Sequence, residues 1–310
     1  MSDNGQYRRI NGGRLWVEDT GGNGPPVLFS HGLLWSSRMF DAQVASLRLR
    51  YRCIAWDHRG QGRSDVPAVR AISMDDCYAD AVALIEQLDV APVHLVGLSM
   101  GGFVAMRLAA RRPDLVRSCV LLETSAEAEP AENVPRYRTL NRVARWFGLR
   151  VVAGRVMPIM FGTTFLRDPA RAAERTLWQS RLAQNRRDIW RAVNGVIERE
   201  PVMPELGRIT APTLIMVGDE DVATVPLKAE RIHAAIRGSE LVRIPQAGHT
   251  SSVEQPDVVT TTIAAWLERV EQHHTGHIFE GTPHTRGRHG RRQNETHRRQ
   301  RGQLPRRHHR

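Results

Sequence analysis

Short apolar runs alternate with longer segments of helical periodicity over the first 125 residues of the chain. The apolar and β-branched runs predict strands at residues 15–19, 27–30, 52–57, 93–98 and 116–123. Several of these runs are continuously apolar, as at residues 27–29, which is typical of strands covered on both faces. A regular alternation of such strands with helices predicts a doubly wound, mostly parallel sheet of the α/β class.

The same pattern returns near the end of the chain. Residues 213–217 and 240–244 are predicted strands, and residues 256–270 form a predicted helix with a proline in its first turn. Residues 1–124 and 207–270 are therefore expected to build one α/β core together.

Between these two halves, residues 125–206 have a different character. No convincing strand pattern occurs there, and prolines break Arg- and Ala-rich helical pieces into short units. The segment contains large apolar residues at Trp146, Phe147, Met157, Met160, Phe161, Phe165, Trp178 and Trp190. We expect a helical lid over the strand ends, with most of these side chains packed between lid and sheet and a minority lining a pocket.

The net charge of +11 is concentrated at the C-terminus. Residues 271–310 contain ten Arg and three Glu, a balance of +7, which leaves +4 spread over residues 1–270. This tail also has eight of the thirteen His and almost no large apolar residue, so we expect it to be disordered. The mild surplus on the core predicts no specific nucleic-acid partner, and we assign the tail no activity.

Composition narrows the class of protein further. The chain has 41% hydrophobic and 25% charged residues, without an apolar run of the roughly 18 to 20 residues that a membrane span needs. The N-terminus is polar, unlike a signal peptide, and the cysteines at positions 53, 77 and 119 form no CxxC pair. We therefore expect a cytoplasmic protein with no disulfide framework, no metal, no organic cofactor and no membrane association.

Residues 97–101, Gly-Leu-Ser-Met-Gly, have the form G-x-S-x-G between a predicted strand and a helical pattern. A nucleophilic serine needs such a sharp turn, because the turn exposes the hydroxyl beside a helix N-terminus that favours negative charge. The two glycines remove side chains that would collide there. Ser99 is therefore the candidate nucleophile, and a plain glycine-rich turn is the alternative.

A second turn, Ser-His-Gly-Leu at residues 30–33, ends an earlier predicted strand. We expect the backbone N–H groups of Leu33 and Met100 to point to the same place, where two donors would stabilise an oxyanion. His31 offers itself as a base, but a histidine before a glycine at a strand end is more often structural. We assign it the structural role.

Two further loops provide an acid and a base. Residues 246–249 follow a predicted strand and leave His249 at its carboxyl edge, and Gly-Asp-Glu-Asp at residues 218–221 ends another strand. The order Ser99, Asp221, His249 is the chain order of a nucleophile, acid and base on such a sheet. In this chemistry the histidine accepts the serine proton, and the carboxylate fixes its tautomer and stabilises the imidazolium.

These motifs resemble the α/β-hydrolase superfamily over about residues 10–270. Residues 57–64, Asp-His-Arg-Gly-Gln-Gly-Arg-Ser, look like that family's loop D-x-R-G-x-G-x-S, and Gly-His at 248–249 followed by Glu-Gln-Pro looks like the setting of its catalytic histidine. The resemblance implies an α/β-hydrolase fold with an inserted lid. It also implies that residues 57–64 are a structural turn and not a phosphate site.

The resemblance bears on the choice of acid as well. In the family the acid usually comes three residues after the glycine that ends its strand, which selects Asp221 over Asp219. Some members of the family place the acid one strand earlier, where this chain has Glu123, so that position stays open.

Within the superfamily the chain is similar to the 3-oxoadipate enol-lactonases and to the cofactor-free haloperoxidase or perhydrolase esterases. The resemblance implies that a small-molecule ester or lactone is hydrolysed through an acyl-enzyme intermediate on Ser99. C–C bond hydrolysis, or perhydrolase or haloperoxidase chemistry on the same triad, is the closer alternative. A non-catalytic binding protein of the same fold is the alternative from another class.

The expected lid should define the pocket for the acyl group, and its aromatic residues favour a small or medium apolar or lactone substrate. It also has fourteen Arg against nine acidic residues between positions 125 and 205. That surplus would permit contact with a substrate carboxylate, as a dicarboxylate lactone requires. Solvated helix faces are the more common reason for such a surplus.

Overall fold

The computed structural model describes residues 5–280 of the chain, and the side chains of residues 5–274. Its strands are β1 (Gln6–Ile10), β2 (Gly13–Asp19), β3 (Pro26–Ser30), β4 (Arg52–Trp56), β5 (Val93–Leu98), β6 (Val116–Leu122), β7 (Thr213–Gly218) and β8 (Glu240–Ile244). Within the described residues they form one sheet in the order β1-β2-β4-β3-β5-β6-β7-β8. The pairs from β4 through to β8 are parallel and only the pairs that involve β2 are antiparallel, which confirms the predicted mostly parallel sheet.

The sequence pattern does not predict β1, because most of its residues are polar and exposed. A two-residue turn at Asn11 and Gly12, both with positive φ, joins β1 to β2 as a hairpin. Asn-Gly is the dipeptide that such turns favour, so the turn was the available sequence signal for this edge strand.

Helices α1 (Asp41–Leu47), α2 (Met74–Leu88), α3 (Met100–Arg111), α9 (Pro226–Ala235), α10 (Ser251–Glu254) and α11 (Pro256–Glu280) alternate with these strands. Helix α2 starts at a capping box, in which Ser73 and Asp76 each accept the other's N–H at 3.0 Å. Helix α3 is buried along almost its whole length and packs against α2, β3 and β5. None of the helices that the structure describes combines the length and the hydrophobicity of a membrane span.

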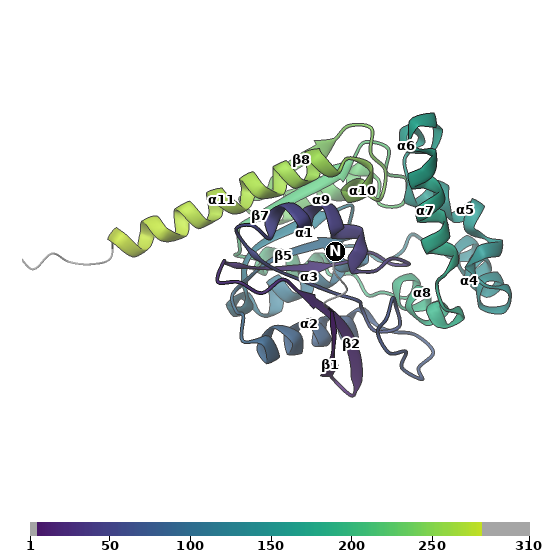
Figure 1. Ribbon diagram of the computed structural model, residues 1–310, viewed down its shortest axis with the longest axis horizontal. Coiled ribbons are helices and arrows are strands. Elements are labelled where there is room, and N and C mark those ends of the chain that lie inside the picture. The colour runs from purple at the N-terminus through teal and green to yellow at the C-terminus, as the bar shows by residue number, and fades with distance from the viewer. Residues whose placement is uncertain (1–4, 281–310) are drawn as a thin grey trace, which may run out of the picture. The chain divides into compact units, whose positions relative to one another are not determined.

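The chain between β6 and β7 folds into α4 (Val134–Phe147), α5 (Ala153–Met160), α6 (Thr163–Arg167), α7 (Ala172–Ala183) and α8 (Trp190–Ile197). Figure 1 shows these inserted helices gathered on one side of the sheet. Aromatic rings anchor them to the core. Trp35, from the loop after β3, packs edge-on against Trp178 and Phe161, with ring centroids 5.2 and 5.8 Å apart.

Two aromatic residues expected to pack between lid and sheet do not do so. Trp146 and Phe147 are 63% and 68% exposed, so the expectation was wrong for this pair. Helix α4 buries Asn141 and Ala144 and leaves its last turn in solvent. The Arg145 guanidinium covers one face of the Trp146 ring at 5.5 Å, which shields part of that apolar surface.

Helix α11 continues to Glu280, beyond its predicted end at residue 270. Residues 271–280, which composition assigned to a disordered tail, are therefore helical. Glu271 contacts the sheet at the start of this extension, where its carboxylate is hydrogen-bonded to His94 at 3.0 Å and Arg117 at 2.9 Å. Residues 5–272 form one compact unit, which ends within α11. The disorder expected for residues 281–310 lies outside the described residues.

Helix α8 docks through its backbone on the loop before α2. The Ile72 N–H donates to the Arg191 carbonyl at 3.0 Å, and the Asn194 side chain donates to the Arg70 carbonyl at 3.1 Å. A Cβ atom on Gly195 would lie 1.6 Å from the Ile72 carbonyl oxygen, so only glycine permits this approach.

We predict that Gly195→Ala lowers the free energy of unfolding by about 2 kcal/mol, because the added methyl group overlaps backbone that cannot move aside easily. Gly154→Ala in α5 is the matched control. A Cβ atom there meets no atom within 4 Å, and alanine favours a helix by up to about 1 kcal/mol over glycine. Urea unfolding of both variants measures the two effects, and equal stabilities would contradict the close docking of α8.

Candidate active site

Ser99 lies in the sharp turn between β5 and α3. Its backbone φ of +53° is a left-handed value that residues other than glycine rarely adopt. Its N–H donates to the Leu122 carbonyl at 2.9 Å. A Cβ atom on Gly97 would lie 2.5 Å from the Gly101 carbonyl oxygen, and one on Gly101 would lie 1.9 Å from the Ser30 carbonyl oxygen. Close backbone approach therefore requires both glycines of the motif.

The structure brings Ser99, His249 and Asp221 together, from the loops that follow β5, β8 and β7. His249 Nε2 lies 2.8 Å from Ser99 Oγ, and Nδ1 of the same ring lies 3.1 and 3.0 Å from the two carboxylate oxygens of Asp221. All three side chains are buried. Because an ionised carboxylate only accepts, Nδ1 carries a proton and Nε2 can accept one from the serine hydroxyl.

Further hydrogen bonds fix the Asp221 carboxylate. One oxygen accepts the N–H groups of Ala223 at 2.8 Å and Thr224 at 3.0 Å, and the other accepts the Thr224 hydroxyl at 2.7 Å. Burial by itself would raise the pKa of Asp221, but His249 and Thr224 more than offset this and lower the pKa below its ordinary value. Asp221 is therefore ionised beside the histidine at neutral pH.

The other two carboxylates weighed from the sequence lie elsewhere. Asp219 forms a surface ion pair with Arg243 at 2.7 Å. Glu123 is buried just after β6, where it accepts the Gly218 N–H at 3.1 Å, and burial raises its pKa well above the ordinary value. Among these three described carboxylates, Asp221 is the one hydrogen-bonded to His249.

The backbone N–H groups expected to hold an oxyanion lie next to Ser99. Met100 follows it directly as the first residue of α3, and the turn at residues 30–33 packs against it, since a Cβ atom on Gly32 would lie 3.5 Å from Ser99 Cβ. Neither the Leu33 N–H nor the Met100 N–H donates to another group within the described part of the chain. Both donors are therefore available to a ligand at Ser99.

His31 holds the turn at residues 30–33 in place. Its Nε2 accepts the His58 N–H at 2.9 Å, and its Nδ1 lies 2.8 Å from the Gly32 carbonyl oxygen. These partners require a neutral ring that is protonated on Nδ1. Burial lowers the pKa of His31, which agrees with the neutral form. The ring therefore joins this turn to the loop at residues 57–64.

Sequence reasoning missed Gln61, which belongs to that loop. Its side-chain oxygen accepts the Leu34 N–H at 2.9 Å, and its side-chain nitrogen lies 3.4 Å from the Met100 sulfur. Gln61 thus contacts Leu34, the residue after one expected oxyanion donor, and the side chain of Met100, the other expected donor. Asp57 fixes the loop itself by accepting two backbone N–H groups, each at 2.8 Å. The motif marks the loop, but spacing alone does not reveal which side chain reaches the site.

A buried carboxylate joins the inserted helices to the loop that contains His249. Glu254 accepts the N–H groups of Gly162, Gly248 and Thr250 at 2.8, 2.9 and 3.0 Å. Gly162 precedes α6, and the other two donors flank His249 along the chain. One side chain therefore fixes the backbone on both sides of the histidine and holds the start of α6 against it.

A second carboxylate joins α6 to the loop that contains Asp221. Glu220, the residue before Asp221, accepts both the N–H of Thr164 at 2.8 Å and its hydroxyl. A negative charge at a helix N-terminus is favourable, and here it also joins the loop of the acid to the inserted helices. The sequence offered Glu220 and Glu254 as acidic residues near the site but gave no sign of these partners.

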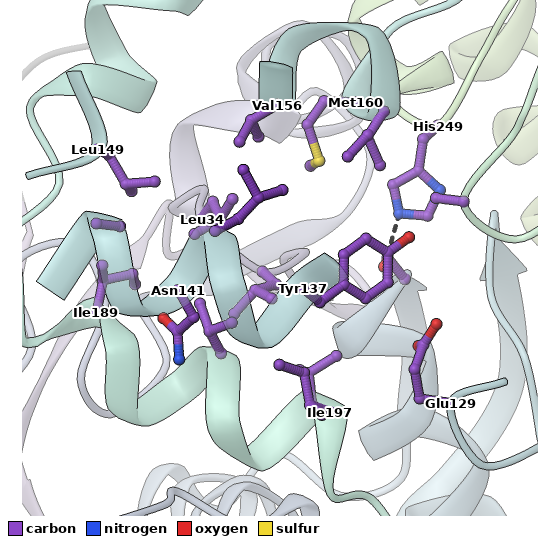
Figure 2. Close-up of a pocket in the computed structure, with 18 of the residues that line it drawn as sticks. Leu34, Glu129, Tyr137, Asn141, Leu149, Val156, Met160, Ile189, Ile197 and His249 are labelled. Carbon is purple, nitrogen blue, oxygen red and sulfur yellow. Dashed lines mark hydrogen bonds between the residues drawn. The ribbon is translucent and has the colours of Figure 1, made fainter. Parts of the chain in front are cut away.

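A cavity of about 140 Å³ lies beside Ser99 and His249. Its wall is mostly aliphatic and comes from the loop after β3 and from α4, α5 and α8. Figure 2 shows Tyr137 of α4 beside His249, while Leu149 and Ile189 lie at the opposite side of the cavity. An uncharged group of modest size would fit such a space next to the serine.

The cysteines, all within the described residues, offer no alternative nucleophile. All three are buried free thiols, and burial raises the pKa of Cys53 and that of Cys119 to about 12, so these thiols are protonated at neutral pH. The described residues also contain no group of three or more His, Cys, Asp or Glu side chains that could hold a metal ion.

Comparison with known proteins gives consistent matches. Residues 25–256 match the family model described as the alpha/beta hydrolase fold. The putative non-heme bromoperoxidase BpoC of Mycobacterium tuberculosis is 29% identical, over 82% of this chain and 97% of that protein. The crystal structure of the enol-lactonase from Burkholderia xenovorans matches with a TM-score of 0.79 and 26% identity, over 85% of this chain and 100% of that one. A thermophilic esterase from Thermogutta terrifontis matches with a TM-score of 0.78 and 30% identity, over 86% and 99%.

We predict that Glu254 makes the stability of the protein depend on pH. Burial raises the pKa of Glu254 from 4.5 to about 7, so the folded protein holds this proton more tightly than the unfolded chain does. The contribution of Glu254 to stability is therefore fully present below about pH 4.5 and falls as the pH rises through 7. Glu254→Gln cannot titrate, so its deficit in unfolding free energy relative to wild type should shrink between pH 5 and pH 8.

Urea unfolding at four pH values across that range measures the deficit. Glu132→Gln, an exposed position with the same change of charge, is the control and should follow wild type throughout. A deficit for Glu254→Gln that stays constant or grows with pH would show that Glu254 does not titrate in this range.

Proposed function

Because the chain belongs to the α/β-hydrolase fold family, we propose that it hydrolyses a carboxylic ester or lactone through Ser99, His249 and Asp221. The observation that supports this best is the unbroken hydrogen-bonded series from Ser99 Oγ through the His249 ring to the Asp221 carboxylate. The series ends at a cavity with an aliphatic wall, where a substrate can meet the serine hydroxyl.

In the proposed reaction His249 Nε2 accepts the Ser99 proton while Oγ attacks the acyl carbon. Charge then develops on the carbonyl oxygen, and the N–H groups of Leu33 and Met100 stabilise it. His249 returns the proton to the leaving alkoxide, which leaves an acyl group on Ser99. Asp221 stays ionised throughout and stabilises the imidazolium.

A water molecule completes the cycle. His249 removes a proton from the water as it attacks the acyl carbon, and then returns that proton to Ser99 Oγ when the acid is released. A lactone follows the same steps, except that its leaving oxygen stays on the acyl chain as a hydroxyl group. Hydrolysis of the ester to Ser99 therefore releases a single hydroxy acid.

We propose in addition that residues 125–206 act as a lid domain on a core of residues 1–124 and 207–270. This proposal is supported by the elements that form the wall of the cavity. Tyr137 and Leu140 come from α4, Val156 from α5 and Val193 from α8, while the serine and histidine come from the core. The lid residues would therefore decide which acyl groups reach Ser99.

Short-chain p-nitrophenyl esters test the proposed function. Wild type should hydrolyse them, and Ser99→Ala should lower kcat by at least about 10 000-fold because the nucleophile is lost. Asp221→Asn should lower kcat by about the same factor, because an amide cannot fix the histidine tautomer in the same way.

Asp219→Asn is the matched control, since it makes the same change two residues away at an exposed ion pair. Its kcat should stay within about threefold of wild type. Equal losses for the two aspartate variants would remove Asp221 from its proposed role. Turnover that survives in Ser99→Ala would remove the serine mechanism altogether.

A further inference from the structure

The cavity beside Ser99 has a single basic side chain other than the histidine on its described wall, and that side chain is already paired. Arg199 lines the cavity together with Glu129, and their side chains form an ion pair with Nη1 2.7 Å from Oε2. The two side chains are 2% and 9% exposed, so water screens the pair very little. The positive charge is therefore neutralised before any ligand enters.

Further contacts fix the Arg199 side chain beside Glu129. Its Nε donates to the Glu127 carbonyl at 3.0 Å, Nη1 also donates to the Val196 carbonyl at 2.9 Å, and the guanidinium covers the Phe103 ring at 4.5 Å. Arg199 is therefore held in place by backbone carbonyls and an aromatic ring as well as by Glu129.

Glu129 has a second contact besides the one with Arg199. Its second carboxylate oxygen accepts an N–H from the Asn133 side chain at 3.1 Å. Figure 2 shows Glu129 on the same side of the cavity as His249, away from Leu149 and Ile189. Turning Glu129 away would break both contacts, so the carboxylate stays beside Arg199.

Apart from the side chains of Tyr137, Asn141 and Thr224, the rest of the wall offers little to an anion. It consists chiefly of Leu33, Leu140, Leu149, Val152, Ile159 and Val193 with similar aliphatic neighbours. A carboxylate placed among these side chains would lose its hydration without gaining a countercharge, which is costly in free energy. An alkyl chain of the same length would gain from leaving water.

The other arginines of the inserted segment do not alter this balance. Within the described wall of the cavity, Arg199 is the single arginine out of the fourteen between positions 125 and 205. Others form ion pairs away from it, as Arg171 does with Glu174 and Arg191 with Asp188. The surplus of arginine therefore does not supply a free cation for a substrate carboxylate in the cavity.

We propose that this cavity selects uncharged, apolar acyl groups over acyl groups that carry a carboxylate, and that Glu129 sets this preference by neutralising Arg199. The inference rests on the proposed function and narrows its substrate class. A lactone or ester that has a second carboxylate in its acyl part would be a poor substrate, whereas a straight-chain aliphatic ester would be a good one.

Matched ester pairs test the preference in the wild-type protein. The p-nitrophenyl esters of pentanoate and hexanoate are compared with the mono-p-nitrophenyl esters of glutarate and adipate, which have the same chain lengths and end in a carboxylate. After subtraction of the spontaneous rates, kcat/KM should be higher for the uncharged member of each pair, on the order of 100-fold. Equal rates, or faster hydrolysis of either anionic ester, would overturn the proposed preference.

Glu129→Gln tests the role of the ion pair. The amide oxygen can still accept from Asn133 or Arg199, but Arg199 keeps a charge that is no longer neutralised. The ratio of kcat/KM for anionic to uncharged esters should rise by on the order of tenfold for at least one chain length. Glu132→Gln makes the same change at an exposed position three residues away and should leave the ratio unchanged. A folded Glu129→Gln protein with the wild-type ratio would remove Glu129 from this role.

Binding measurements separate this inference from the proposed function. Calorimetry with hexanamide and with the monoamide of adipic acid requires no turnover. If no ester is hydrolysed but hexanamide binds more tightly, the proposed function fails and the preference of the cavity stands. If esters are hydrolysed and the anionic amide binds as tightly as hexanamide, the preference fails and the proposed function stands.

Discussion

The turn from β5 to α3 holds the backbone of Ser99 in a left-handed conformation, and the arrangement of the site depends on this turn. Ser99 has a φ of +53° because the strand must reverse into a helix within one residue, and the backbones at Gly97 and Gly101 approach their neighbours too closely for any side chain. The same turn leaves the Met100 N–H pointing out of the first turn of α3. The proposed nucleophile and one proposed oxyanion donor therefore come from one local constraint, and the parallel sheet places Asp221 and His249 after neighbouring strands.

The strained turn needs support from loops that are distant in sequence. His31 and Gln61 join the turn after β3 to the loop at residues 57–64, so the second expected oxyanion donor is held relative to the serine. Glu254 and Glu220 hold the histidine loop and the acid loop against the start of α6. The geometry of Ser99, His249 and Asp221 and the position of the inserted helices are consequently coupled, because the same carboxylates maintain both.

Much of this arrangement could be predicted from sequence because its signals are local. The strands and the motif around Ser99 depend on neighbouring residues, and the chain order of Asp221 and His249 follows from the sheet topology. Contacts such as that of Glu254 with Gly162 join residues about ninety positions apart and leave no periodic pattern. For the same reason, the aromatic content of α4 did not reveal that Trp146 and Phe147 face solvent, and the composition of residues 271–280 did not reveal that the helix continues.

Labelling with a fluorophosphonate tests most directly whether Ser99 is an activated nucleophile. The reagent reacts with a serine whose hydroxyl is deprotonated by a neighbouring base and whose developing oxyanion is stabilised, so it reports on Ser99, His249 and the backbone donors together. Peptide mapping of the folded protein should find a single adduct, on Ser99, and labelling should be lost in urea and in Ser99→Ala. An unmodified Ser99 in folded protein, or an adduct on another residue, would contradict the proposed mechanism.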